Sequence, residues 1–397
     1  MSMNFEFVML KKKLIQRIAK LSDFSEIIYE YQKYINYLYD VSIIKSTNNE
    51  HSIDLYSQFS EIPDIKKQLY TPFKFGKVNH ICFESLNNYH KYGVFYSREQ
   101  RCISFDTQTV SYIDKYYHGM EQSLPENIQN VIDLLHLENV SIDYIPYAME
   151  NLLFSNQNKD VVLNTLFSFE KIISKHKQSD DLCIEVAEET VNLYEKFHHT
   201  LFNGLDKLYY SIYSIILNAV IIQFNNSKIS LDKKMEKMCD FINSKLCCLM
   251  IPEIIVSKRY FEKGQNYSFF GKVQKNRNDI IKVIRNMTWD LMHLRILEQG
   301  CAYPNLPDIS LFIPYLFTYD TRLLEVKDCY EFDALAVWKT TRATIPVYAN
   351  TNEIESYLNK LCTPSATYER NQKHSQVNIS NLISSLEFQL LSICNTK

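Results

Sequence analysis

Four acidic residues lie at positions, at strand ends or on inward helix faces, where a carboxylate suggests a chemical role. Asp106 directly follows the short apolar run 102–105, which is of strand type, and Asp320 follows a similar run at 315–319. Asp290 falls on the apolar stripe of a helix predicted over residues 278–298, and Glu150 has apolar or aromatic neighbours three and four residues away. A carboxylate on an inward face costs several kcal/mol unless a cation or hydrogen-bond donors compensate it.

A divalent metal ion would compensate all four charges. Ligand sites in open parallel α/β sheets gather just beyond the carboxyl ends of the strands, where Asp106 and Asp320 are predicted to lie. Mg²⁺ and Mn²⁺ prefer carboxylate oxygens, and such a cluster suits phosphodiester hydrolysis. We therefore predict a Mg²⁺ or Mn²⁺ site that contains Asp106, Glu150, Asp290 and Asp320 and that also provides the catalytic groups.

Each acid also has an ordinary structural explanation. Asp106 and Asp320 each precede the start of a predicted helix, and Asp is a favoured N-cap residue. Asp290 could pair with a buried cation, for which Arg295 and Arg322 are available, and a similar structural explanation is open for Glu150. The hypothesis of a site depends on the four acids occurring together, because none of them is specific alone.

The elements that would position these acids are strands alternating with helices over residues 101–350. This alternation predicts a parallel sheet flanked by helices, with further strands at 140–144, 335–339 and 344–348. Residues 1–100 are expected to form a mainly helical N-terminal region, 155–280 a large helical insertion, and 351–397 a helical C-terminal tail.

The four acidic segments resemble the motifs of the PIN-like nuclease family. These segments are the strand ending at 104–108, the helix at 146–153, the helix at 286–291 and the strand ending at 317–320. PIN-like domains carry an Asp followed by Thr or Ser, a helical Glu, a helical Asp, and a last Asp reached through a Thr-x-Asp step. Thr107 and Thr318 fall on the two hydroxyl positions and are predicted supporting residues. The long step from Glu150 to Asp290 departs from a compact PIN domain, which is why we place an insertion there.

The resemblance implies a Mg²⁺- or Mn²⁺-dependent nuclease, more often acting on RNA than on DNA, that leaves 5′-phosphate and 3′-hydroxyl ends. Such endoribonucleases often act as toxins or defence effectors, alone, as homo-oligomers or with a regulatory partner protein. Two alternatives remain open. One is a non-catalytic nucleic-acid-binding or scaffold protein with a PIN-like core, and the other is a structural helical protein in which the acids coincide by chance.

The charge distribution limits where nucleic acid could bind. The net charge is −3, so any such contact needs a local basic patch. Residues 258–285 hold eight basic residues against two acids, with aromatic residues between them. Basic groups with interleaved aromatics suit single-stranded nucleic acid, although a solvated basic loop with buried aromatics is an equal alternative. The predicted contacts are Arg259, Lys263, Lys272, Lys275 and Arg277.

A cytoplasmic location is expected. The first 13 residues contain no apolar stretch long enough for a signal peptide, and the ten cysteines show no metal-finger spacing. The apolar stretch 208–224 is short for a membrane span and is interrupted by polar residues, so we predict a buried helix and no membrane contact.

Overall fold

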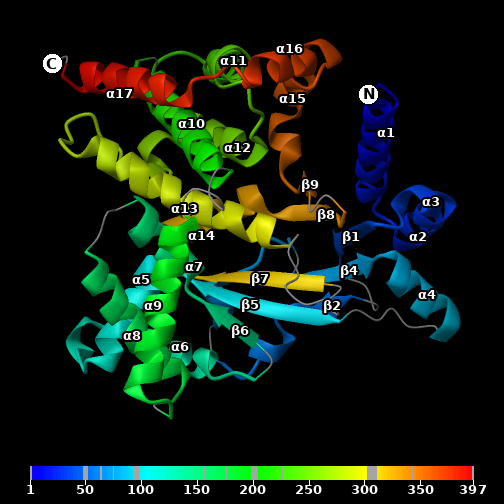
Figure 1. The fold of residues 1–397 in the computed structure, drawn as a ribbon. Helices are drawn as coiled ribbons and strands as arrows, with labels where there is room; N and C mark the ends of the chain where they lie inside the picture. Colours follow the sequence, from blue (N-terminus) through cyan, green and yellow to red (C-terminus); the bar gives the residue numbers. More distant parts are fainter. Residues whose placement is uncertain are drawn as a thin grey trace. The chain divides into compact units, whose positions relative to one another are not determined.

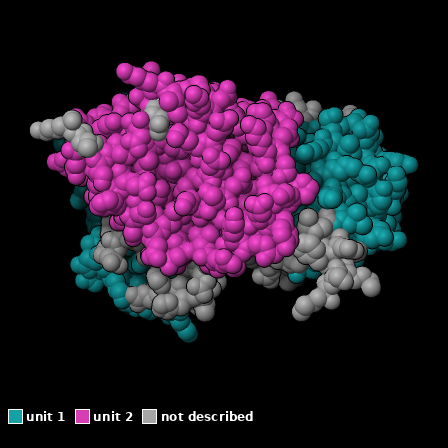
Figure 2. Space-filling model, turned by 90° about the horizontal axis from the view of Figure 1, so that it is seen from above, with its two compact units in different colours: residues 1–196, 294–320, 331–349 teal, residues 197–293, 321–330, 350–397 magenta. Residues whose placement is uncertain are grey.

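The structure is a computed structural model of the 397-residue chain. It describes residues 2–47, 52–62, 65–74, 76–92, 98–138, 140–154, 158–175, 177–197, 204–225, 227–301, 311–340 and 343–395. The chain divides into two compact units, coloured separately in Figure 2. Unit 1 comprises residues 1–196, 294–320 and 331–349, and unit 2 comprises residues 197–293, 321–330 and 350–397. Both units draw on distant parts of the chain.

A four-stranded sheet in unit 1 contains the predicted strand ends (Figure 1). Its strands are β3 (Leu69–Tyr70), β7 (Leu311–Phe317), β5 (Glu99–Phe105) and β6 (Val140–Asp143), in that order. β5 runs parallel to both β6 and β7, and β3 is antiparallel to β7. The predicted mixed α/β class with parallel strands is confirmed, and the expected strands at 102–105, 140–144 and 315–319 correspond to β5, β6 and β7.

A second sheet of unit 1 is antiparallel throughout. Its order is β2 (Ile53–Asp54), β4 (Lys77–Ile81), β1 (Val41–Ser46), β8 (Phe332–Trp338) and β9 (Ala343–Tyr348). One face is covered by α1 (Ser2–Ala19) and α2 (Phe24–Lys33), whose Ile15, Ile18 and Ile27 join the core. β-branched residues in β1 suit this buried position, because β1 lies in the centre of the sheet.

This second sheet corrects two expectations. Residues 1–100 were expected to be mainly helical, and their described part contains four helices, but residues 41–81 also contribute the strands β1 to β4, which were not expected. Strands were also predicted near 335–339 and 344–348, and β8 and β9 confirm them, but they pair antiparallel with each other and β8 pairs with β1. The alternation of strands and helices missed this because strands 41–46 and 332–338 meet across most of the chain.

Unit 2 is helical within the described residues. α10 (Leu205–Asn225) is its central helix and packs against α12 (Ile251–Lys263) and α17 (Ile379–Asn395). Of the helices that the structure describes, α10 is the one long and apolar enough to cross a membrane, but most of it is buried inside the protein. A buried core helix of a soluble protein has this composition, as the sequence analysis predicted for 208–224.

The remaining helices complete the two units. α13 begins in unit 2 and ends in unit 1. The helices not yet given are α3 (Ile35–Leu38), α4 (Phe83–Tyr92), α5 (Thr107–Tyr117), α6 (Ile128–Leu135), α7 (Ile145–Ala148), α8 (Lys159–Ile173), α9 (Asp180–Phe197), α11 (Leu231–Phe241), α13 (Ile280–Gly300), α14 (Thr321–Val326), α15 (Glu355–Leu361) and α16 (Pro364–His374).

Candidate active site at the ends of the parallel strands

The strand order creates a switch point between β5 and β7. From β5 the chain passes through α5 and α6 to β6 on one side, and it later enters β7 on the other side. In open α/β sheets, ligands bind in the crevice outside the carboxyl ends of the strands at such a point. Phe105 and Phe317 pair at the ends of β5 and β7, so the residues that follow them are placed at this crevice.

Asp106 lies directly beyond β5 and is held by three hydrogen-bond donors. Its Oδ1 accepts from the Thr109 amide at 2.7 Å and the Thr109 hydroxyl at 2.5 Å. Its Oδ2 accepts from the Thr318 hydroxyl at 2.5 Å. The first bond makes Asp106 the N-cap of α5, so the structural explanation for this acid holds. The bond from Thr318 adds a tie across the switch point that a cap does not need.

The environment of Asp106 opposes its negative charge. Only 6% of the residue is exposed, and burial raises the pKa of its carboxyl group, against the lowering effect of the bonds from Thr109 and Thr318. The charge of Asp320 raises this pKa further. A cation near the two carboxylates would relieve the same repulsion.

Glu150 lies near Asp106 in a stretch of π-helix, Met149–Phe154, that follows α7. The Thr107 hydroxyl donates to Glu150 Oε2. Burial raises the pKa of Glu150, and the Asp106 charge adds to the rise. π-Helical turns occur frequently at functional sites. Thr107 and Thr318, predicted as supporting residues, therefore each donate to one of the predicted acids.

Asp320 completes the group in unit 1. Its backbone N–H donates to Thr318 Oγ1 at 3.0 Å, so the Thr318 side chain lies between the Asp320 backbone and the Asp106 carboxylate. Asp106 thus interacts electrostatically with both Asp320 and Glu150. Three of the four acids predicted from the sequence belong to one neighbourhood of unit 1.

A magnesium or manganese ion could be held by these acids only if it used one or two protein carboxylates and took its other ligands from water or substrate. Among the described residues, no three His, Cys, Asp or Glu side chains are grouped closely enough to form a ready metal-binding set. Mg²⁺ keeps several waters and is commonly held by one or two carboxylates together with substrate phosphates. Asp106 and Asp320, whose charges interact, are the two carboxylates that could serve this smaller requirement.

Asp290 belongs to the other unit. It lies on α13 in the part assigned to unit 2, it is half-buried, and its neighbours Met287, Trp289 and Leu291 are buried. The helix and its inward stripe follow the prediction. The role of Asp290 beside the three acids of unit 1 stays a prediction.

Sequence reasoning missed two residues near the strand ends. Thr109 supplies two of the three donors to Asp106, and an Asp followed three residues later by Thr was the available signal. Asp143 ends β6 and accepts from Cys102 Sγ at 3.1 Å, Ser104 Oγ at 2.8 Å and the Ile145 amide at 2.9 Å. Burial raises the pKa of Asp143. Its position at the end of the run 140–142 gave the same signal as Asp106.

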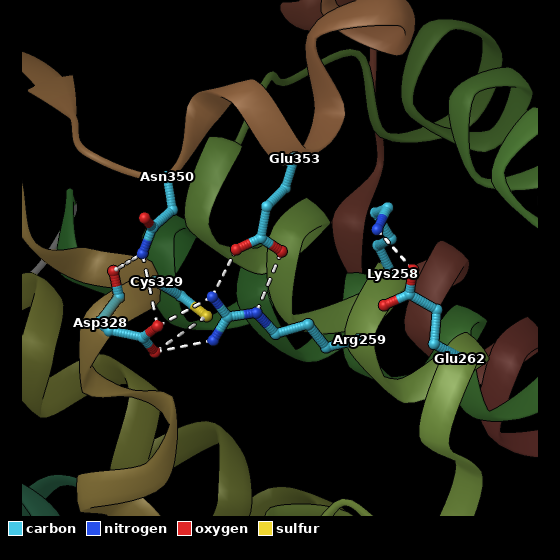
Figure 3. Close-up of polar contacts among 7 residues, drawn as sticks. All are labelled: Lys258, Arg259, Glu262, Asp328, Cys329, Asn350 and Glu353. Carbon is cyan, nitrogen blue, oxygen red and sulfur yellow. Dashed lines mark hydrogen bonds and ion pairs between the residues drawn. The ribbon is translucent and has the colours of Figure 1, made fainter.

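The predicted nucleic-acid contact Arg259 forms a structural ion pair within unit 2. Its guanidinium donates to Asp328 at 2.7 and 2.8 Å and to Glu353 at 2.5 and 3.1 Å (Figure 3). Asn350 Nδ2 in turn donates to the Asp328 backbone oxygen at 2.8 Å. Four of the five N–H groups of Arg259 are therefore occupied. A role for Arg259 in binding nucleic acid would require these bonds to break.

The other predicted basic contacts are more accessible. Arg277 pairs with Asp279 at 2.5 Å on the surface. Lys263, Lys272 and Lys275 are exposed, and among the described residues none of the three has an acidic partner. By contrast, the aromatic residues interleaved with them, Tyr260, Tyr267, Phe269 and Phe270, are at most 2% exposed. These rings pack in the core, so the alternative of buried aromatics holds for this segment.

The groups around Asp106 are suited to two chemical tasks. A buried Asp at a switch point, tied by two threonines and electrostatically coupled to a second Asp and a Glu, can hold a cation and can place or deprotonate a water. Comparison of the chain with protein-family models, with curated proteins and with solved structures gives no match.

Proposed function

We propose that this protein is a divalent-metal-dependent nuclease with a PIN-like core, and that its substrate is RNA. One observation carries the proposal: Asp106 lies at the switch point of the parallel strands, hydrogen-bonded by Thr318 and electrostatically coupled to Asp320 and Glu150. We place this activity in the cytoplasm, and cleavage of cellular RNA by a toxin or defence effector is a role that it would serve.

In this proposal each residue has a distinct task. Asp106 and Asp320 would hold Mg²⁺ or Mn²⁺, and Thr318 would orient the Asp106 carboxylate. When bound, such an ion neutralises charge that develops on the phosphate and makes a water more acidic. Glu150, whose pKa is raised by burial and whose Oε2 is held by Thr107, would accept a proton from the attacking water. Asp290 would add a fourth carboxylate.

The test is cleavage of labelled RNA and DNA pools by the purified protein. We expect cleavage of RNA with Mn²⁺ or Mg²⁺ and none with chelator. Asp106→Asn is expected to lower the rate by about 100-fold or more, because even outer-shell partners of metal sites cost 10- to 100-fold.

Asp143→Asn is the matched control for this substitution. It also removes a strand-end carboxylate whose pKa is raised. This carboxylate ends β6 and accepts from Ser104, and it does not share the donors Thr109 and Thr318 that hold Asp106. Circular dichroism checks that both variants fold. Full activity of Asp106→Asn, or equal loss in the two folded variants, would refute the role given to Asp106.

A non-catalytic nucleic-acid-binding or scaffold protein is the second candidate function. It is favoured by the three donors that already satisfy Asp106 as a helix cap, and by the lack of a ready three-ligand metal set among the described residues. Fluorescence anisotropy with labelled RNA in chelator distinguishes the two. RNA that binds and stays intact when Mn²⁺ is added would support the scaffold and refute the nuclease.

A further inference from the structure

Unit 2 contains an open polar cleft whose lining includes none of the four predicted acids. Its volume is about 560 Å³, which lies within the range of 300–1,000 Å³ that is common for small-ligand sites. Four of the lining side chains are amides, one is a lysine and none is acidic. The lining residues are Gln223, Phe224, Ser227, Tyr260, Gln265, Gln274, Lys275 and Asn276.

Tyr260 is the most deeply buried of the polar residues that line this cleft. The residue is 0% exposed, and no described residue forms a hydrogen bond with its Oη. Its ring is fixed by stacking on Phe270, with centroids 3.9 Å apart. Burial raises the pKa of the phenol, so the group remains a neutral donor and acceptor at physiological pH. A buried polar group without a partner destabilises the folded state, and a ligand in the cleft would supply the missing bond.

Neighbouring residues orient two of the amides. The buried Lys234 donates from Nζ to Gln223 Oε1 at 2.9 Å and to the Ser227 backbone oxygen at 3.3 Å. Gln265 Nε2 donates to the Val273 backbone oxygen at 2.9 Å. These bonds use the oxygen of Gln223 and the nitrogen of Gln265. The amide nitrogen of one and the amide oxygen of the other are thus left for a ligand, one donor and one acceptor.

The charge of Lys275 and the ring of Phe224 indicate which other groups a ligand in this cleft would carry. Lys275 is exposed, and its Nζ lies 5.5 Å from the centroid of the half-buried Phe224 ring. An ammonium group binds phosphate, and an aromatic face stacks on a planar heterocycle. Side-chain amides recognise the paired donor and acceptor edge of a nucleobase.

We propose that this cleft binds a nucleotide, with the base against the amides and the Tyr260 hydroxyl and the phosphate at Lys275. A free mononucleotide and a single nucleotide of an RNA strand share this chemistry. The inference does not depend on the nuclease activity, because it concerns unit 2 residues and requires no divalent ion.

The experiment is isothermal titration calorimetry with the full chain in chelator. The probes are the four ribonucleoside monophosphates, the matching nucleosides, ribose 5-phosphate and a short single-stranded oligoribonucleotide. We expect at least one monophosphate to bind more tightly than its nucleoside and more tightly than ribose 5-phosphate. Tighter binding of the oligonucleotide than of every monophosphate would assign the cleft to a strand, and the reverse would assign it to the free mononucleotide.

Two substitutions locate the site. Tyr260→Phe removes only the hydroxyl and is expected to weaken binding roughly tenfold while raising the melting temperature of the free protein, since an unpaired buried group is deleted. Lys275→Met is expected to weaken monophosphate binding but not nucleoside binding, and Lys282→Met, an exposed lysine outside the lining, is its control. Absence of binding by every nucleotide probe, equal binding of ribose 5-phosphate, or unchanged affinity in Tyr260→Phe would overturn the proposal.

Discussion

Divalent ions should stabilise unit 1 if Asp106 and Asp320 hold them. An ion that binds only the folded state stabilises it by about 2.7 kcal/mol when its concentration is 100 times the dissociation constant. Unit 1 comprises residues 1–196, 294–320 and 331–349, which is the size class in which 1 kcal/mol shifts the melting temperature by about 2–4 °C. We therefore expect saturating Mn²⁺ to raise the melting temperature of this unit by about 5–10 °C.

The same physics predicts the opposite pattern for Asp106→Asn. Removal of one carboxylate relieves the repulsion from Asp320 and Glu150, so the variant should melt at an equal or higher temperature than the wild type in chelator. It should then gain little from Mn²⁺. Differential scanning fluorimetry over a Mn²⁺ titration measures both quantities, and Asp143→Asn serves as the control that keeps the full shift. If wild type and Asp106→Asn gain equally from Mn²⁺, the ion does not bind at Asp106 and the assignment fails.

Three further outcomes follow from the described contacts. Thr318→Val removes a donor to a charged carboxylate and should lower the free energy of unfolding by about 1.5–3 kcal/mol in urea titrations at pH 7; no loss would contradict the tie to Asp106. Burial raises the pKa values of Asp106 and Glu150 in the folded state, so the folded state binds these two protons more tightly than the unfolded state. The stability of the wild type relative to Asp106→Asn should therefore fall as pH rises above about 4, and a rise in this difference between urea midpoints would be the contrary result. Arg259→Ala removes the ion pairs of Asp328 and Glu353 and should lower the free energy of unfolding by about 1–3 kcal/mol (Figure 3). Lys258→Ala breaks the exposed pair with Glu262 and should lower it by under about 1 kcal/mol, so equal losses would contradict the structural role of Arg259.

The sequence predicted the strand-end acids because their positions follow from local signals. A short apolar run followed by Asp marks the end of a strand, and parallel strands bring such ends to one edge of a sheet. Asp106 and Thr318 meet for this reason, although they are 212 residues apart. Glu150 was recognisable because Pro146 and Tyr147, four and three residues before it, are apolar or aromatic, and both are buried.

Pairing between distant segments was not predictable in the same way. The antiparallel sheet joins β1 to β8 across nearly the whole chain, and one sequence contains no local signal for that register. Arg259 shows the same limit for charge. It was counted as part of a basic segment, but its two carboxylates lie 69 and 94 residues later in the chain. A local charge balance overstates a basic patch whenever acids from distant segments pair with it.

The cap and the metal site are compatible explanations of Asp106, and the geometry of its carboxylate says why. A carboxylate accepts at about four lone-pair positions. Thr109 occupies two of them on Oδ1, and Thr318 occupies one on Oδ2. One position on Oδ2 therefore remains, on the oxygen that Thr318 holds at the switch point. A helix cap requires only the bond from the Thr109 amide. The additional donors fix the orientation of an already buried charge, which is what a site built to receive a cation needs and what a cap alone does not explain.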